Sequence, residues 1–199
     1  MDIEVGEVHN AIDAGEIAAG NINSHHPING AGMSRWIHVV GRLRSQLALR
    51  DWRGEDPRGR PVSNHNTLPY GLAVVGGNEI TGIADHPRGP LAARKKGIGT
   101  AEAVTGTIPM IPIETLRKQP TLVPEAAPPP GNWFLLYYRS ETKVRLEISL
   151  PLGFDLDDGQ FTGWRIRVIL PSWDISDPTA QKPLDVGGQD VDFQVSEVS

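Results

Sequence analysis

The chain has 199 residues, no cysteine and a formal net charge of −5, with 39% hydrophobic and 22% charged residues. This length fits one domain or a domain with an appendage, and the composition is too apolar for a wholly disordered protein. The absence of cysteine excludes disulfides, cysteine-ligated zinc, iron–sulfur clusters and thiol nucleophiles. The 22 glycines and 17 prolines favour many turns and short elements over a long helical bundle.

No run of residues approaches the roughly 18 consecutive apolar positions that a membrane-spanning helix requires. The first ten residues, MDIEVGEVHN, are acidic and lack the basic and then apolar layout of a signal peptide. We therefore expect no membrane association and a cytoplasmic location.

The charges are distributed unevenly along the chain. Residues 1–34 hold five acidic and no basic side chains, residues 35–96 hold eleven basic and five acidic ones, and residues 97–199 hold eight basic and fourteen acidic ones. A basic middle between acidic flanks indicates either an anionic partner or internal pairing on a solvated surface. Most of the basic residues are arginine, whose planar fork suits phosphates and carboxylates.

Two amphipathic helices are expected near the N-terminus. Apolar residues at roughly helical spacing predict the first over residues 6–19. The second is predicted over residues 34–52, with Ser34 as its N-cap. Its apolar stripe consists of Trp36, Val40, Leu43 and Leu47. The stretch NSHHPINGAGMSRW (23–36) is then the loop that leads into this helix.

The pattern that follows is less regular. Residues 53–69 read as a polar loop rich in proline and glycine. Residues 70–83 (YGLAVVGGNEITGI) predict a β-hairpin whose turn lies at 76–78. Residues 84–99 predict a basic loop, and Thr100 looks like the N-cap of a short helix over residues 100–104.

The segment before the C-terminal third is rich in proline. Residues 107–113 predict an edge strand or an extended segment, and residues 114–118 a helical turn. The stretch PTLVPEAAPPPG (120–131) is either a surface crossing within one domain or a stiff spacer between two. We favour a single domain over residues 1–199, with an internal boundary at 120–131 as the alternative.

The C-terminal third predicts an antiparallel β-meander. Strands are expected over residues 132–138, 142–150, 161–170 and 191–198, and an acidic hairpin loop, rather than a calcium loop, over 154–161. Alternation in the two middle strands predicts one core-facing and one solvated face. The expected core-facing residues are Val144, Leu146, Ile148, Leu150, Trp164, Ile166, Val168 and Leu170, and the expected solvated ones are Lys143, Arg145, Glu147, Ser149, Arg165 and Arg167. The predicted fold class is α+β, with N-terminal helices, a C-terminal antiparallel β-meander and Gly/Pro-rich loops.

Loop histidines are the first candidates for chemistry. No HExxH or HxH spacing and no GxSxG motif is present, and we predict no metal site and no cofactor. Polar loops nevertheless carry functional residues in many proteins, and three such loops can converge in space. The catalytic candidates are His25, His26, His65, Asp85 and His86.

The second candidate is a phosphate-binding region in the basic middle. In RKKGIGTAEAVTG (94–106), two glycines precede the expected helix start, where free backbone N–H groups attract anions. GxxxxGK[ST] is absent, so this segment is not a P-loop. The predicted phosphate-contacting residues are Arg42, Arg44, Arg53, Arg58, Arg60, Arg88, Arg94, Lys95, Lys96, Gly97, Gly99 and Thr100.

These patterns favour surface recognition over catalysis. We predict a non-enzymatic binding or assembly protein, a subunit or accessory factor of a larger complex, whose Arg-rich middle contacts nucleic-acid phosphates. An acidic protein surface, including that of a second copy of this chain, is the rival partner. Two further alternatives remain open: a hydrolase or nuclease that uses the loop histidines, with or without a metal, and a structural component of a particle.

Overall fold

The computed structural model describes residues 1–106 and 128–175. Its helices are α1 (Val5–Gly20), α2 (Gly30–Leu47), the short 3-10 helix η1 (Pro57–Gly59) and α3 (Ile98–Thr105). Its strands are β1 (Trp52–Glu55), β2 (Val62–His65), β3 (Tyr70–Gly76), β4 (Gly131–Arg139), β5 (Lys143–Asp155) and β6 (Gln160–Asp174). The expected α+β class is confirmed.

The six strands form one sheet in the order β1-β2-β3-β4-β5-β6. All neighbours are antiparallel except β3 and β4, which run parallel along their full overlap from Tyr70↔Gly131 to Gly76↔Tyr137. The parallel pair was not predicted, and it requires a long connection between the two strands. Strands that flank the Pro-rich stretch 120–131 therefore lie side by side in the same sheet.

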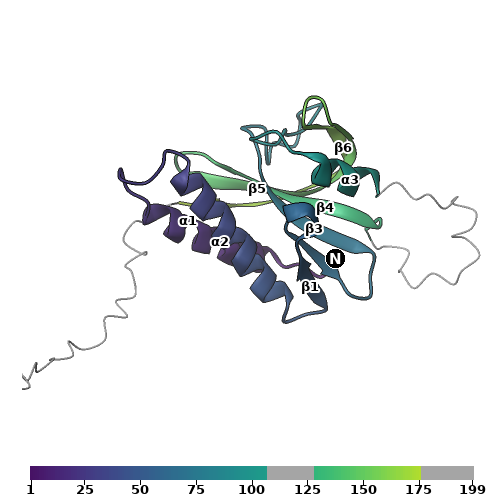
Figure 1. Cartoon of the computed structure of the whole chain (residues 1–199), viewed down its shortest axis with the longest axis horizontal. Coiled ribbons are helices and arrows are strands. Elements are labelled where there is room, and N and C mark those ends of the chain that lie inside the picture. The colour runs from purple at the N-terminus through teal and green to yellow at the C-terminus, as the bar shows by residue number, and fades with distance from the viewer. Residues whose placement is uncertain (107–127, 176–199) are drawn as a thin grey trace, which may run out of the picture.

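Helices α1 and α2 pack side by side over one face of the sheet (Figure 1). They approach closely at Gly15, where a Cβ atom would lie 2.5 Å from Cγ2 of Val39. Between helices and sheet lies the larger core cluster, which includes Val8, Ile12, Val39, Leu43, Leu47, Leu72, Trp133, Leu135, Val144, Leu146 and Leu150. The α2 stripe and the core-facing residues of β5 were predicted correctly.

The opposite face of the sheet is also covered. A smaller cluster joins β3, β4, β6 and α3 through Ala73, Val75, Val104, Phe134, Leu136 and Phe161. The loop after β3 crosses the same face, where the backbone N–H of Gly82 donates to the carboxylate of Glu147 at 2.9 Å. Arg167 also donates to the carbonyl oxygen of Ile83 at 2.9 Å.

The meander was expected to have one solvated face, but the loop after β3 covers part of that face. Glu147 and Ser149 are fully buried, and only 14% of the Arg167 side chain is exposed. Arg167 donates to both oxygens of Glu147, and Ser149 donates to one of them at 2.8 Å. Alternation therefore grouped these residues correctly on one face but did not reveal the loop that buries them.

Two of the core-facing residues expected on β6 are also corrected. Val168 is 44% exposed, and Trp164 lies on the other face of the sheet. Trp164 packs in the smaller cluster, on the face opposite to the one that Ile166 faces. The register explains the change, because Leu150 pairs with Ile166 while the next residue, Pro151, pairs with Trp164. This bulge places one extra residue in β6 and reverses the faces beyond it.

The predicted hairpin at 70–83 is wrong in its second half. β3 ends at Gly76, and no strand follows it at 80–83. The side-chain oxygen of Asn78 accepts hydrogen bonds from the backbone N–H groups of Ile80 and Leu91, which holds a compact turn instead. The strand partner comes later, at the bridge between Gly77 and Ala92.

The segment predicted as a polar loop over 53–69 contains the hairpin β1–β2, in which Trp52 pairs with His65 and Glu55 with Val62. It forms because Trp52 and Val62 are buried, at 3% and 2% exposure, whereas Arg53, Asp56 and Arg58 between them are exposed. β1 has one buried residue and β2 has two, and such short strands give little periodicity in the sequence.

Helix boundaries differ from those predicted at both ends of α2 and at the start of α3. α2 ends at Leu47 rather than at 52, and Trp52 begins β1. α2 begins at Gly30, so Ser34 lies inside the helix and donates to the carbonyl of Ala18 rather than acting as the N-cap. α3 begins at Ile98 with Gly97 as its N-cap, so Thr100 lies in its first turn. The expected helix over 6–19 and the acidic turn between β5 and β6 are confirmed. The segments predicted at 107–113, 114–118 and 191–198, and most of 120–131, lie outside the described residues.

Candidate phosphate-binding groove

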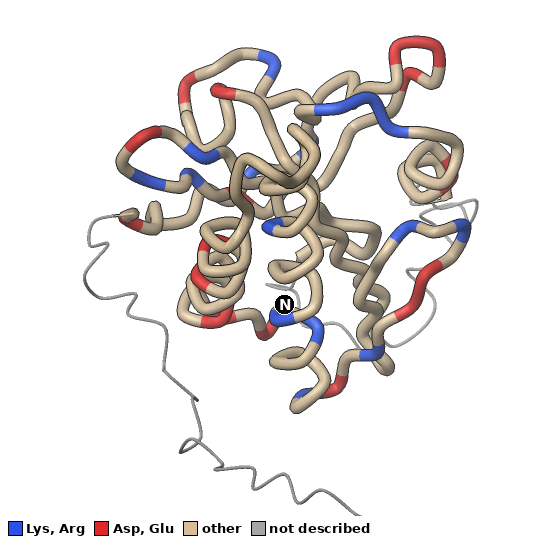
Figure 2. Tube along the Cα trace, turned by 60° about the vertical axis from the view of Figure 1, so that its left-hand side comes forward, with Lys and Arg blue, Asp and Glu red and all other residues tan. Residues whose placement is uncertain are grey.

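Most of the basic middle is paired internally. Six of its eleven cations contact carboxylates: Arg35 with Glu16, Arg44 with Asp56, Arg50 with Glu4 and Glu7, Arg53 with Glu55, Arg58 with Glu102 and Lys95 with Asp158. Blue and red segments also alternate along the trace in Figure 2, so the basic middle forms no single basic face in the described part of the chain. The cations without a carboxylate partner among the described residues are Arg42, Arg60, Arg88, Arg94 and Lys96.

Three of these unpaired cations lie along the free edge of β3. β2 pairs with β3 only at Gly71 and Leu72, so the rest of this edge has no strand beside it. The indole N–H of Trp36 donates to the carbonyl of Val74 at 3.0 Å and fixes α2 against the edge. Further along, the backbone N–H of Ala93 donates to Gly76 at 2.8 Å. Two adjoining pockets open along this edge, and both are lined by Trp36 and Lys96.

The first, which we call the α3 pocket, has a volume of about 310 Å³. It lies between η1, the edge of β3 and the N-terminus of α3. Six of the predicted phosphate-contacting residues line it: Arg58, Arg60, Lys96, Gly97, Gly99 and Thr100. The structure thus brings together two segments that are about 40 positions apart in the sequence.

A tight turn places the arginines of this pocket. Arg58 and Gly59 both adopt left-handed backbone conformations, with φ of 51° and 69°. Glycine tolerates this conformation readily, whereas arginine does so at a cost. The turn brings the Cβ atoms of Arg58 and Arg60 to 3.6 and 3.8 Å from the point where a side chain on Gly99 would begin.

Two cations in the α3 pocket are held in an unfavourable state. The Nε and Nη1 atoms of Arg60 are buried and have no hydrogen-bond partner among the described residues. Burial lowers the pKa of the Arg60 guanidinium, and burial together with the nearby charge of Arg94 lowers the pKa of the Lys96 amine. Buried charges without partners destabilise a fold, so an anion bound in this pocket would compensate the charges of Arg60 and Lys96.

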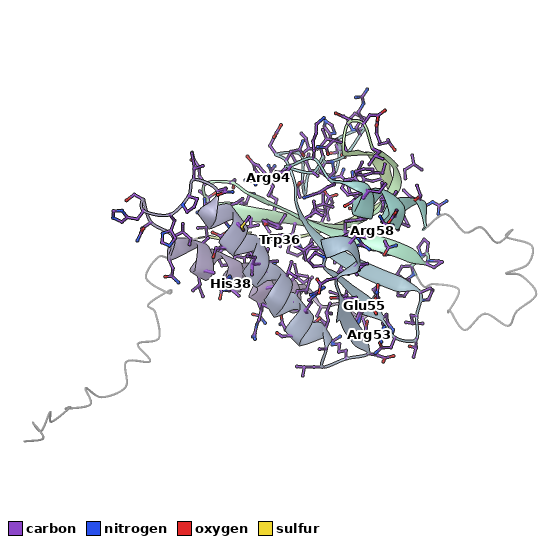
Figure 3. The ribbon with its side chains drawn as sticks, in the orientation of Figure 1. Trp36, His38, Arg53, Glu55, Arg58 and Arg94 are labelled. Carbon is purple, nitrogen blue, oxygen red and sulfur yellow. The ribbon has the colours of Figure 1, made fainter. Side chains whose placement is uncertain are left out.

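The second pocket, which we call the α2 pocket, has a volume of about 370 Å³. It lies between the first turns of α2 and the ends of β3 and β4, and its aromatic lining consists of Trp36, Tyr137 and Tyr138. Figure 3 shows Trp36 between α2 and the sheet, with Arg94 and Arg58 in the segments on either side of it. The Tyr137 side chain belongs to the core cluster, and burial raises the pKa of its hydroxyl to about 12.

Together the two pockets form a groove without an acidic lining residue in the described part of the chain. Its cations are Arg35, Arg58, Arg60, Arg94, Lys96 and Arg139. Two carboxylates behind the lining compensate part of this charge: Glu16 pairs with Arg35 and Arg139, and Glu102 with Arg58. Six cations against two acids leave an excess of four positive charges, in a protein whose net charge is −5.

The histidine candidates lie elsewhere. His25 and His26 lie in the exposed loop between α1 and α2, and Nδ1 of His26 lies 2.9 Å from Oδ1 of Asn23. His65 is on β2, where its Nδ1 accepts from the backbone N–H of Leu68 at 3.1 Å. Because Nδ1 accepts, the proton of a neutral ring is on Nε2.

The third candidate loop holds Asp85 and His86, beyond the turn that the Glu147 carboxylate fixes through Gly82. Among the described residues, no hydrogen bond or ion pair joins this loop to His65 or to the loop of His25 and His26. No group of three or more metal-ligating side chains is present in residues 1–106 and 128–175. Within the described chain, neither a histidine nor a carboxylate lines the groove.

Five of the predicted phosphate-contacting residues lie outside the groove. Arg44, Arg53 and Lys95 are engaged with acidic partners, whereas Arg42 and Arg88 are exposed. Arg94, the remaining one, lines the α2 pocket. The prediction missed Arg35, Tyr137, Tyr138 and Arg139, because their contribution depends on α2 lying over the ends of β3 and β4.

Within the described residues, no helix is long and apolar enough to cross a bilayer. Comparison of the chain with models of known families, with curated protein sequences and with solved structures finds no match in any of the three.

Proposed function

We propose that this chain is a non-enzymatic binding protein, a subunit or accessory factor of a larger complex, whose groove binds phosphate groups of a nucleic acid. One observation carries the proposal: Arg60 and Lys96, both partly buried and without a carboxylate partner among the described residues, line a pocket that has no acidic lining residue in the described chain. Paired surface arginines need no ligand, whereas desolvated and unpaired ones gain most from an anion.

The backbone of the α3 pocket supports the same ligand. At the start of α3 the N–H groups of Thr100 and Ala101 bond to the carbonyl of Gly97, while those of Ile98 and Gly99 precede the first helical bond. Free N–H groups and the positive end of the helix dipole favour a phosphate oxygen at this point. The Arg60 guanidinium offers a planar fork that matches two oxygens of one phosphate.

The test is binding of labelled RNA and DNA across a salt series, by fluorescence anisotropy. If the groove holds phosphates, the logarithm of the affinity falls linearly with the logarithm of salt concentration, with a slope of about −0.7 to −0.9 per phosphate contacted. The double variant Arg60→Met/Lys96→Met should bind more weakly and with a shallower slope. The matched control is Arg42→Met/Arg88→Met, which also removes two cations without carboxylate partners but lies outside the groove.

Two results contradict the proposal. One is an absence of binding even at low salt. The other is an equal loss of affinity in the groove variant and the control variant, which would assign binding to overall charge. Polyglutamate serves as a second probe, and binding to it as strong as to nucleic acid would favour an acidic protein partner.

A further inference from the structure

We infer that the nucleic acid bound here is single-stranded, with one unpaired base inserted in the α2 pocket while a neighbouring phosphate lies in the α3 pocket. This inference rests on the proposed function and names the ligand class of the same groove. The two pockets share Trp36 and Lys96 as lining residues, so one continuous ligand can occupy both.

The α2 pocket has the features of a site for a planar ring. Its volume of about 370 Å³ lies within the range of small-molecule sites, and three aromatic side chains and Met33 line it. Tyr138 already carries the guanidinium of Arg145 on its ring, 4.9 Å from the centroid, and the Tyr137 ring packs in the core cluster. The partly exposed Trp36 is therefore the aromatic surface for a ligand. Aromatic side chains bind bases of any sequence by stacking.

Tyr137 lines the α2 pocket and adds a hydrogen-bonding group to it. The residue is 8% exposed, but its hydroxyl is not among the fully buried polar atoms that lack a partner in the described residues, so the hydroxyl is accessible from the pocket. Since burial also keeps this hydroxyl protonated, it is available to donate to a ring nitrogen or exocyclic oxygen of a base.

A duplex does not use this site. Its bases are paired and stacked, so a protein reaches them inside a pocket only after they leave the stack. Phosphate contacts alone would occupy the α3 pocket and leave the α2 pocket without a ligand group. A single strand presents its bases free and occupies both pockets.

The experiment compares three labelled probes of equal length in anisotropy titrations at low salt: a single-stranded oligonucleotide, the same backbone with abasic positions, and the corresponding duplex. We expect the single strand to bind about tenfold or more tightly than either of the others. Tyr137→Phe keeps the ring and should weaken binding of the single strand several-fold without changing binding of the abasic strand.

A second variant tests the α2 pocket in case the loss of one hydroxyl at Tyr137 changes the affinity too little to measure. Met33 is 53% exposed on α2 and lines the α2 pocket, so Met33→Trp fills the pocket from a surface position that tolerates it. This variant should lower the affinity of the single strand to that of the abasic strand. Equal binding of all three probes to the unmodified protein overturns the inference and leaves the proposed function in place, whereas binding of none overturns both.

Discussion

The buried carboxylate of Glu147 on β5 joins the sheet to the loop that follows β3, and replacing it tests how much this contact stabilises the fold. Glu147 is fully buried and accepts four hydrogen bonds: from Nε and Nη2 of Arg167 at 3.1 and 2.6 Å, from Ser149 at 2.8 Å and from the backbone of Gly82 at 2.9 Å. Through Gly82 it holds the loop that leads to the groove. Replacing it by glutamine keeps the shape and removes the charge.

We expect Glu147→Gln to lower the free energy of unfolding by about 3–5 kcal/mol, the usual effect of removing one partner from a buried ion pair. The reason is that Arg167, with 14% of its side chain exposed, keeps a charge that neither water nor a carboxylate compensates. The control is Asp158→Asn, which breaks the pair with Lys95, where both side chains are about two-thirds exposed, and should cost at most about 1 kcal/mol.

Urea denaturation followed by circular dichroism measures both variants, provided that the slope with urea is unchanged. The double variant Glu147→Gln/Arg167→Met removes the uncompensated charge and should recover part of the lost stability. Two results refute the reasoning about the uncompensated charge. One is that Glu147→Gln lowers the stability no more than Asp158→Asn does. The other is that the double variant loses as much stability as Glu147→Gln and Arg167→Met lose together when each is measured alone.

Three further outcomes follow from the groove and the helix contact. Arg60→Met should weaken nucleic-acid binding while raising the free energy of unfolding by about 1–3 kcal/mol, measured by urea denaturation, because it removes buried donors that lack partners. Because burial and Arg94 lower the pKa of Lys96, affinity should fall as pH rises toward 10.5, the usual lysine value, whereas Lys96→Arg should hold its affinity over that range in the same titrations. Gly15→Ala should lower stability by about 1–3 kcal/mol in urea, since its Cβ would lie 2.5 Å from Val39, whereas Gly41→Ala, with open space around it, should not.

Periodicity predicted the elements that bury one clear face. The α2 stripe of Val40, Leu43 and Leu47 and the alternation of Val144 and Leu146 on β5 are strong local signals, and these residues are buried as expected. Such a pattern shows which residues share a face but not what covers that face. The burial of Glu147 therefore follows only from the path of a loop more than sixty positions earlier in the chain.

Non-local pairings were the other part that the sequence left open. Nothing in the local pattern of β3 indicates that it runs parallel to β4, because the partner lies about sixty residues away. The turn at Asn78 was misassigned because its two glycines match a hairpin as well as they match the observed side-chain-capped turn. Bulges such as the one beside Pro151 shift the alternation by one residue and leave no clear trace in composition.

The groove was half predictable for the same physical reasons. Glycines next to Lys96 at the start of a helix are a local sign of anion binding, so this part of the groove could be predicted from the sequence. Tyr137 reads as an ordinary core residue, because its place in a buried strand hides the hydroxyl that it adds to the α2 pocket.

The energetics of Arg60 and Lys96 connect the fold to the proposed ligand. Each charge lies in a partly desolvated position without a compensating acid among the described residues, so it lowers the stability of the free protein. A methionine at either position would fill similar space without that penalty. Both residues line a pocket with further cations, so their unfavourable charges favour the bound state, because an anion there meets groups that have already lost part of their water. Part of the cost of removing water from Arg60 and Lys96 then arises during folding rather than during binding. The smaller cost on binding raises the affinity for an anion.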